Sequence, residues 1–278
     1  MAKTVLANTL RQDVVLKGIG LHSGAPATVR LRSAPPGIGI VFVRTDLPGQ
    51  PSASARMFDQ NAPPFRTVIK NGAAEIHTVE HLLAAFAGLQ ITDCRVEIDA
   101  LEMPGMDGSA LEFAQAIVKA GVREDPTASV EVLTVREPVV LSDGAAQLEA
   151  HPYDAGLKIT YTLDYKGHPL AQGTYEIELT PESFLKEIAP ARTFAVKQEA
   201  ERMRAAGLGK GANYQNTVVV DGSRALETTL RFDNEPIRHK ILDLVGDLYV
   251  LGRPLHAHIV ARYSGHKLNR ELARKLGE

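Results

Sequence analysis

The chain has 278 residues, a formal net charge of −2 and a single cysteine. The near-neutral charge offers no basic field for nucleic acid, and one cysteine excludes both a disulfide framework and a thiolate-rich zinc site. No signal peptide and no run of about 18 apolar residues is present, so we expect a cytosolic protein without stable membrane insertion. Any bound metal must be held by carboxylates and by some of the nine histidines.

The first part of the chain alternates between strand and helix patterns. Strands are predicted at residues 14–17, 28–32, 38–44, 67–70, 74–76 and 92–98. The spacing of apolar residues predicts helices at 78–89 and 109–121. Residues 47–64 are rich in proline, serine and alanine and predict a loop or short irregular strands.

Residues 124–129 are the best candidate for a linker, and the pattern starts again after them. Strands are predicted at residues 131–136, 138–141, 146–150, 157–163, 173–179, 217–220 and 256–263, and helices near 181 and at 195–206, 235–251 and 266–276. Several strands followed by two helices, twice over, predict an α+β fold of two similar halves. We place these halves at residues 1–126 and 127–278.

The predicted helix at 235–251 carries the most informative polar pattern. His239, Asp243 and Asp247 are spaced four residues apart, so they lie along one face of the helix. An imidazole and a carboxylate one turn apart can bind the same metal ion, and a carboxylate one turn further on can orient another group. The alternative is a His–Asp pair on a solvated face, which contributes only a few tenths of a kcal/mol (roughly 0.2–0.5).

A second polar cluster, at residues 77–81, begins the predicted helix 78–89. Together with His239 and Asp243, His81 would supply the three protein ligands of a catalytic zinc site with one open position. Glu80 would take the proton of a water molecule held by that ion. His77 lies four residues before His81 and forms a rival ligand pair with it, and spacing alone does not separate the two pairs. A structural role is the other interpretation of His77.

Two further residues complete the candidates. Thr193 has a hydroxyl that can donate to a developing oxyanion, and His266 stands at a loop–helix junction where an imidazole can act as a general acid. Considered separately, each has an ordinary alternative: Thr193 as a capping residue and His266 as a surface imidazole.

These segments occur in an order that resembles one known family. The matching segments are His-Thr-Val-Glu-His-Leu at 77–82, Met-Asp-Gly-Ser-Ala at 106–110, Ala-Arg-Thr-Phe at 191–194, Arg-His-Lys-x-x-Asp-x-x-Gly-Asp-Leu at 238–248 and Ser-Gly-His at 264–266. With the loop Gly-Ile-Gly-Leu-His-Ser-Gly at 18–24, they resemble the UDP-3-O-acyl-N-acetylglucosamine deacetylases, zinc enzymes of early lipid A synthesis. The resemblance extends from about residue 10 to about residue 270.

The resemblance implies a specific form of the α+β fold. Two similar two-layer sheet/helix domains would pack through their helices, with the active site between them. Each domain would carry an insert, the first around residues 47–76 and the second, βαβ-like, around 191–220. The second insert would form a hydrophobic passage for an acyl chain, lined by Phe194, Ala195, Val196, Met203, Ala206 and Leu208.

The resemblance also implies an activity and its machinery. The enzyme would hydrolyse the N-acetyl group of UDP-3-O-acyl-N-acetylglucosamine and release acetate, with zinc-bound water as the nucleophile. One Zn²⁺ would be held by His81, His239 and Asp243. Glu80 would be the general base and His266 the general acid.

Supporting roles follow from the same motifs. Asp247 would orient His266, and Thr193 would stabilise the oxyanion. Lys240 is a candidate for contact with the diphosphate or sugar, and Phe194 for contact with the substrate. His22 and Asp107 lie in motif loops, where we expect structural support.

Two alternatives remain open at this point. One is a non-catalytic nucleotide-sugar binding protein with a structural metal, which would close the site with four protein ligands. The other is a zinc deacetylase with a different substrate. The expected partner is a small acylated UDP-amino sugar rather than nucleic acid, and the expected oligomeric state is a monomer.

Overall fold

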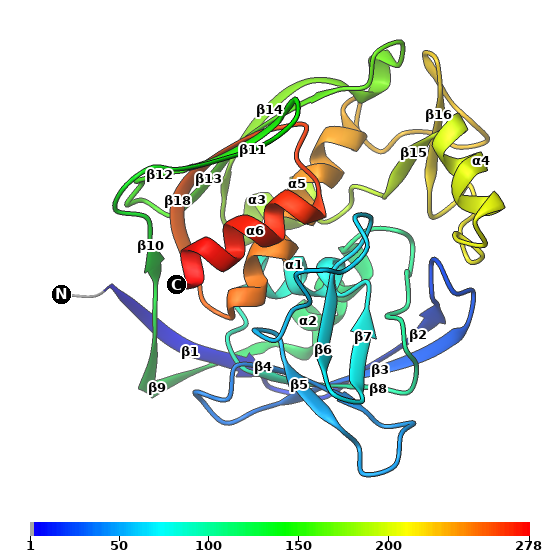
Figure 1. The fold of residues 1–278 in the computed structure, drawn as a ribbon. Coiled ribbons are helices and arrows are strands. Elements are labelled where there is room, and N and C mark those ends of the chain that lie inside the picture. The colour runs from blue at the N-terminus through cyan, green and yellow to red at the C-terminus, as the bar shows by residue number, and fades with distance from the viewer. Residues whose placement is uncertain (1–2) are drawn as a thin grey trace.

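A computed structural model describes residues 3–278. Two β-sheets lie on opposite sides of a central layer of helices (Figure 1). The first sheet has the strand order β2 (Val14–Ile19), β3 (Pro26–Ser33), β8 (Cys94–Ile98), β4 (Ile40–Arg44) and β5 (Ser52–Ser54). The second has the order β11 (Val139–Asp143), β12 (Ala146–His151), β18 (Leu255–Arg262), β13 (Leu157–Asp164) and β14 (Gln172–Leu179), and β10 (Leu133–Thr134) also pairs with β18.

Each sheet buries one face against the helices. Along β13 the side chains of Ile159, Tyr161 and Leu163 are buried, while the residues between them are partly exposed. This period of two is what a strand with one covered face requires. The parallel register with β18 sets Ile159 opposite Ile259, so the buried side chains of neighbouring strands form one continuous apolar surface.

Four helices form the central layer: α1 (Glu80–Gly88), α2 (Leu111–Ala120), α5 (Glu235–Leu248) and α6 (His266–Gly277). Helices α1 and α5 are buried on almost all sides. The mostly apolar sequence of α1 leads us to expect this, whereas α5 also buries the polar side chains of Glu235, His239, Asp243 and Asp247. Helix α5 continues into a 3₁₀ turn at Tyr249–Leu251. The contact between α1 and α5 joins the two sheet-and-helix halves at the centre of the molecule (Figure 1).

Smaller elements extend from this frame. Strands β1 (Thr4–Leu10) and β9 (Val122–Glu131) form an antiparallel ribbon, and β6 (Val68–Asn71) and β7 (Ala74–His77) form a hairpin. In the second half, β15 (Phe194–Val196), α4 (Lys197–Ala205) and β16 (Val218–Asp221) form a βαβ unit with parallel strands, to which β17 (Arg224–Ala225) adds. The short α3 (Pro181–Ser183) runs into a π-helical turn at Phe184–Ile188.

The structure confirms the predicted α+β class and corrects several local predictions. Residues 124–129 are not a linker but part of β9, where a register shift opposite Leu6 and Ala7 accommodates Pro126 in the strand. The helix predicted at 195–206 begins only at Lys197, because the first two residues belong to β15. Strand β1 was not predicted. The division into halves at residue 126 stays a prediction.

The helix predicted at 78–89 begins two residues later, at Glu80, because Thr78 has a left-handed backbone with φ of 58°. None of the helices between residues 3 and 278 is both long and apolar enough to cross a bilayer.

Candidate metal centre and catalytic site

His81, His239 and Asp243 come together where α1 meets α5. Their candidate ligand atoms all lie within 4.8 Å of one another, and all three residues are buried. Nε2 of His239 is 3.3 Å from Oδ1 of Asp243, and Nε2 of His81 is 3.8 Å from the same oxygen. Two imidazole nitrogens and one carboxylate oxygen that converge in this way are a donor set for a divalent transition metal.

A glycine allows the two helices to approach closely enough to form this group. A Cβ atom on Gly246 would lie 2.0 Å from the backbone oxygen of Glu80, so only glycine fits at this crossing. Gly246 lies between Asp243 and Asp247 on α5, and Glu80 precedes His81 on α1. The close contact therefore brings the polar start of α1 directly against the polar face of α5.

The backbone of the second half orients His239. Nδ1 of His239 lies 3.0 Å from the carbonyl oxygen of Ala191, to which it donates. With the proton on Nδ1, the lone pair of Nε2 points toward Asp243 and His81. This is the arrangement found around metal-binding histidines, in which the outer ring nitrogen is hydrogen-bonded and the inner one coordinates.

His77 takes no part in this group. Its Nε2 lies 2.7 Å from Oε1 of Glu75, with which it pairs at the end of β7. Over residues 3–278, His81, His239 and Asp243 are the one cluster of three or more candidate ligands. The geometry therefore separates the two pairs that spacing left open, and it favours His81.

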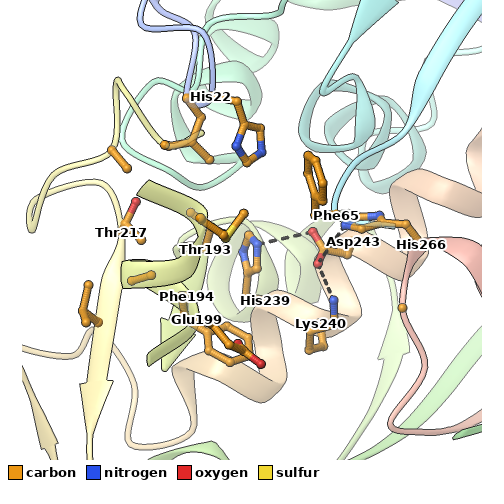
Figure 2. A pocket seen from close by; sticks show the side chains of 18 of the residues that line it. His22, Phe65, Thr193, Phe194, Glu199, Thr217, His239, Lys240, Asp243 and His266 are labelled. Carbon is orange, nitrogen blue, oxygen red and sulfur yellow. Dashed lines mark hydrogen bonds and ion pairs between the residues drawn. The ribbon is translucent and has the colours of Figure 1, made fainter. Parts of the chain in front are cut away.

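The protonation states of the cluster suit a cation. Burial lowers the pKa of His81 to about 3 and also lowers the pKa of His239, so both rings are neutral at physiological pH. Burial alone would raise the pKa of Asp243, but the positive charges of Lys240 and of the protonated His266 outweigh it and lower that pKa. Nζ of Lys240 lies 2.8 Å from Oδ2 of Asp243, and Figure 2 shows Lys240 and His239 at different oxygens of that carboxylate. Oδ1 is the oxygen that faces His239 and His81.

Glu80 lies beside the cluster as a buried carboxyl group. Burial raises its pKa to about 7, with smaller contributions from the charges of Asp247 and Asp243. Its Oε2 accepts a 3.0 Å hydrogen bond from the backbone N–H of Thr67. A carboxyl group with a pKa near neutrality is well suited to accept and release protons.

His266 carries the opposite charge on the other side. Burial alone would lower its pKa, but the carboxylates of Asp247 and Asp243 outweigh it and raise the pKa to about 9. Nδ1 of His266 donates to Oδ2 of Asp247 over 2.8 Å. Asp247 also accepts from the Thr67 hydroxyl at 2.6 Å and from Nδ2 of Asn269 at 2.8 Å, and it is fully buried. The imidazolium is thus held by an anion that is itself held by two further donors.

One cavity of about 460 Å³ opens onto the metal cluster, Glu80 and His266. His81, His239, Asp243, Glu80 and His266 line its inner end, together with Lys240 and Thr193. Asp247 does not line it and lies behind His266. The remainder of the cavity runs along the βαβ unit, as Figure 2 indicates for Thr193, Phe194 and Thr217.

The expected apolar passage is only partly formed by the expected residues. Phe194, Ala195 and Met203 line the cavity, whereas Val196, Ala206 and Leu208 do not. Val196 instead packs with Val218 and Val220 in a small separate core beneath the βαβ unit. The ring of Phe194 stands edge-on to His239, with 6.5 Å between ring centroids, at the junction of the metal cluster and the passage.

Thr193 is held by a closed set of contacts that joins both halves. Its backbone N–H donates to the carbonyl of Gly108 over 2.8 Å. The preceding Arg192 forms a buried ion pair with Glu235, with 2.8 Å between Nε and Oε1. Glu235 also accepts from the backbone N–H of Arg231, whose guanidinium pairs with Asp107 beside Gly108. Asp107 thus supports the Thr193 segment, as expected of a structural residue.

His22 also reaches the cavity. Its backbone N–H donates to Glu102, and its ring tilts against Phe65 with 5.2 Å between centroids. The sequence did not single out Glu102 or Thr67, although both hold segments that border the site. No local pattern marks them, because their partners lie in distant segments of the chain.

Comparisons with known proteins point to one family. Residues 7–278 match the family model described as UDP-3-O-acyl N-acetylglycosamine deacetylase. A Myxococcus xanthus protein named UDP-3-O-acyl-N-acetylglucosamine deacetylase is 42% identical over 270 residues, which cover 96% of this chain and 85% of that protein. Proteins of the same name from Anaeromyxobacter sp. and Bdellovibrio bacteriovorus are 42% and 35% identical, over 96% and 98% of this chain and 87% and 89% of theirs.

Proposed function

The chain belongs to the UDP-3-O-acyl N-acetylglycosamine deacetylase family, and from this we propose that it hydrolyses the N-acetyl group of UDP-3-O-acyl-N-acetylglucosamine in lipid A biosynthesis with the help of one zinc ion. The observation that carries the mechanism is the convergence of His81, His239 and Asp243 in a cavity that Glu80 and His266 also line.

The donor set fits zinc. Neutral imidazoles and a carboxylate are common zinc ligands, and three of them with one position open characterise catalytic sites. When bound, zinc polarises the amide carbonyl and lowers the pKa of water. In this proposal His81, His239 and Asp243 hold the ion, and Ala191 and Lys240 keep two of these ligands in orientation.

Glu80 acts as the general base. Its carboxylate takes a proton from the attacking water while the oxygen of that water bonds to the acetyl carbonyl carbon. Burial suits Glu80 to this task because it raises the pKa to about 7, so that the group is ionised before attack and binds the proton afterwards. Thr193, at the inner end of the cavity, stabilises the negative charge that develops on the carbonyl oxygen.

His266 acts as the general acid. Its imidazolium gives a proton to the sugar nitrogen as the carbon–nitrogen bond breaks, so that the products are acetate and a free amine. The carboxylate of Asp247 keeps the ring charged and oriented through the 2.8 Å hydrogen bond to Nδ1, so Nε2 remains the nitrogen that faces the cavity. Proton transfer leaves His266 neutral and Glu80 protonated, and proton exchange with solvent returns both residues to their starting protonation states.

The remainder of the cavity binds the substrate. Phe194, Ala195 and Met203 offer an apolar surface to the acyl chain, at the edge of the metal cluster. Lys240 contributes positive charge at the sugar, and its pairing with Asp243 keeps its ammonium group at the inner end of the cavity.

Metal removal tests this proposal. We expect protein depleted of metal by a chelator to release no acetate from UDP-3-O-acyl-N-acetylglucosamine, and one equivalent of zinc to restore the release. Full turnover by the metal-free protein would refute the mechanism. Turnover of other N-acetyl sugars, but not of the UDP-sugar, would refute the substrate.

A further inference from the structure

Thr67 lies at the one point where the proposed base and the support of the proposed acid meet. Its backbone N–H donates to Oε2 of Glu80 over 3.0 Å, and its hydroxyl donates to Oδ1 of Asp247 over 2.6 Å. Glu80 belongs to α1 and Asp247 to α5. A single residue of the first insert therefore hydrogen-bonds to carboxylates on both central helices.

Thr67 is itself held firmly in place. Its side chain is completely buried, and its carbonyl oxygen accepts a 2.9 Å hydrogen bond from the backbone N–H of Thr78, at the left-handed turn before α1. The chain just before it is held from α6. There Arg270 donates to the carbonyls of Arg66 and Ala62, over 2.9 and 2.8 Å, from a guanidinium group that is almost fully buried.

The arrangement of α6 makes this anchoring specific. His266, Asn269 and Arg270 lie within about one turn of that helix. His266 and Asn269 both donate to Oδ2 of Asp247, while Arg270 fixes the segment that supplies the donor to Oδ1. The helix that carries the proposed acid thereby also sets the position of Thr67.

We propose that Thr67 is a positioning residue for catalysis, because it hydrogen-bonds both to the base Glu80 and to Asp247, the partner of His266. These bonds hold the two proton-transfer groups, Glu80 and His266, at a fixed separation across the interface of the two halves. The inference rests on the roles proposed above for Glu80, Asp247 and His266. Thr67 does not line the cavity and touches no substrate, so its effect is on the rate of the chemical step and not on substrate binding.

The test distinguishes the effect of the Thr67 hydroxyl on catalysis from the effect of the size of its side chain. Thr67→Val keeps the shape and the backbone N–H but removes the donor to Asp247. We expect kcat to fall about tenfold to a hundredfold, since hydrogen bonds to charged groups are worth that much, with KM and zinc content unchanged. Thr67→Ser retains the hydroxyl and should recover most of the lost rate. Should Thr67→Val not fold, Thr67→Ala removes the same hydroxyl without placing a methyl group against Asp247.

Thr92 provides a matched control. It is also buried, and its hydroxyl also donates to a buried aspartate, Asp93, over 2.7 Å, directly before β8 and away from the cavity. Thr92→Val should lower Tm and leave kcat unchanged. Unchanged kcat in Thr67→Val, or an equal loss in Thr67→Ser, would overturn the proposal.

A double-mutant cycle with Asp247→Asn identifies the route of the effect. If Thr67 acts through Asp247, Thr67→Val should cause little further loss of kcat in the Asp247→Asn background, whereas independent effects would multiply and overturn the proposal. Unchanged kcat in Asp247→Asn alone would refute the role of Asp247, and this inference with it. A loss in Asp247→Asn without a loss in Thr67→Val would refute this inference alone.

Discussion

Gly246→Ala is the substitution that most directly perturbs the assembly of the metal site. The added Cβ would lie 2.0 Å from the backbone oxygen of Glu80, whereas ordinary contact begins at 3.4 Å, so α1 and α5 must separate by about 1.4 Å. Helix propensity alone favours alanine over glycine by about 1 kcal/mol. Overpacking against a rigid backbone costs about 1–3 kcal/mol. Because this cost equals or exceeds the gain in helix propensity, we expect the free energy of unfolding to decrease or to stay unchanged.

The larger effect should fall on zinc. His81 is on α1, while His239 and Asp243 are on α5, so separating the helices pulls one ligand away from the other two. Metal sites tolerate about 0.2 Å in bond length, far less than the displacement required. We expect zinc affinity to fall about 10- to 100-fold, the size of effect seen when the support of a metal ligand is lost.

Gly88→Ala is the matched control for this experiment. Gly88 ends α1, and a Cβ there would lie 2.2 Å from the buried ring of Phe184, remote from the metal cluster. Competition with a chelator and thermal unfolding should show that Gly88→Ala lowers Tm but keeps the zinc affinity. Parental zinc affinity in Gly246→Ala, or equal losses of affinity in both variants, would show that the close approach at Gly246 does not set the zinc site.

Two further predictions concern protonation and the buried ion pair. Glu80 must be ionised and His266 protonated, so kcat/KM should fall below a pH of about 7 and above a pH of about 9. A bound cation should move both of these limits to lower pH. A pH profile of kcat/KM that does not fall on both sides would contradict the assignment of base and acid. Glu235→Gln leaves the guanidinium of Arg192 buried without its anion. The free energy of unfolding, measured by denaturant titration, should therefore drop by about 3–5 kcal/mol. A drop under about 1 kcal/mol would show that the ion pair does not hold the Thr193 segment.

Much of the site could be predicted from the sequence because its residues lie at helical spacing or in short motifs. The step of four from His239 to Asp243 and Asp247 indicated one helix face, and the structure places all three on one side of α5. The choice of His81 over His77 needed the structure, since it depends on the turn at Thr78 and on the pairing of His77 with Glu75.

Other features depend on contacts that no local pattern carries. The carbonyl of Ala191 orients His239 through the backbone, so no side-chain type could reveal it. Thr67 acquires its partners only when the segment before β6 folds against α1, α5 and α6. Residues 124–129 of β9 read as a linker in the sequence because proline and charged residues are rare in strands. They fit here because β9 belongs to a two-stranded ribbon with a bulge.

In the proposed mechanism three buried side chains hold zinc, and Glu80 performs the proton transfer beside it. The most direct test is to measure zinc content and acetate release together in Glu80→Gln. We expect one equivalent of zinc, as in the parent, and a fall in kcat of about 100- to 10,000-fold. A Glu80→Gln protein that binds zinc and turns over at the parental rate would contradict this mechanism.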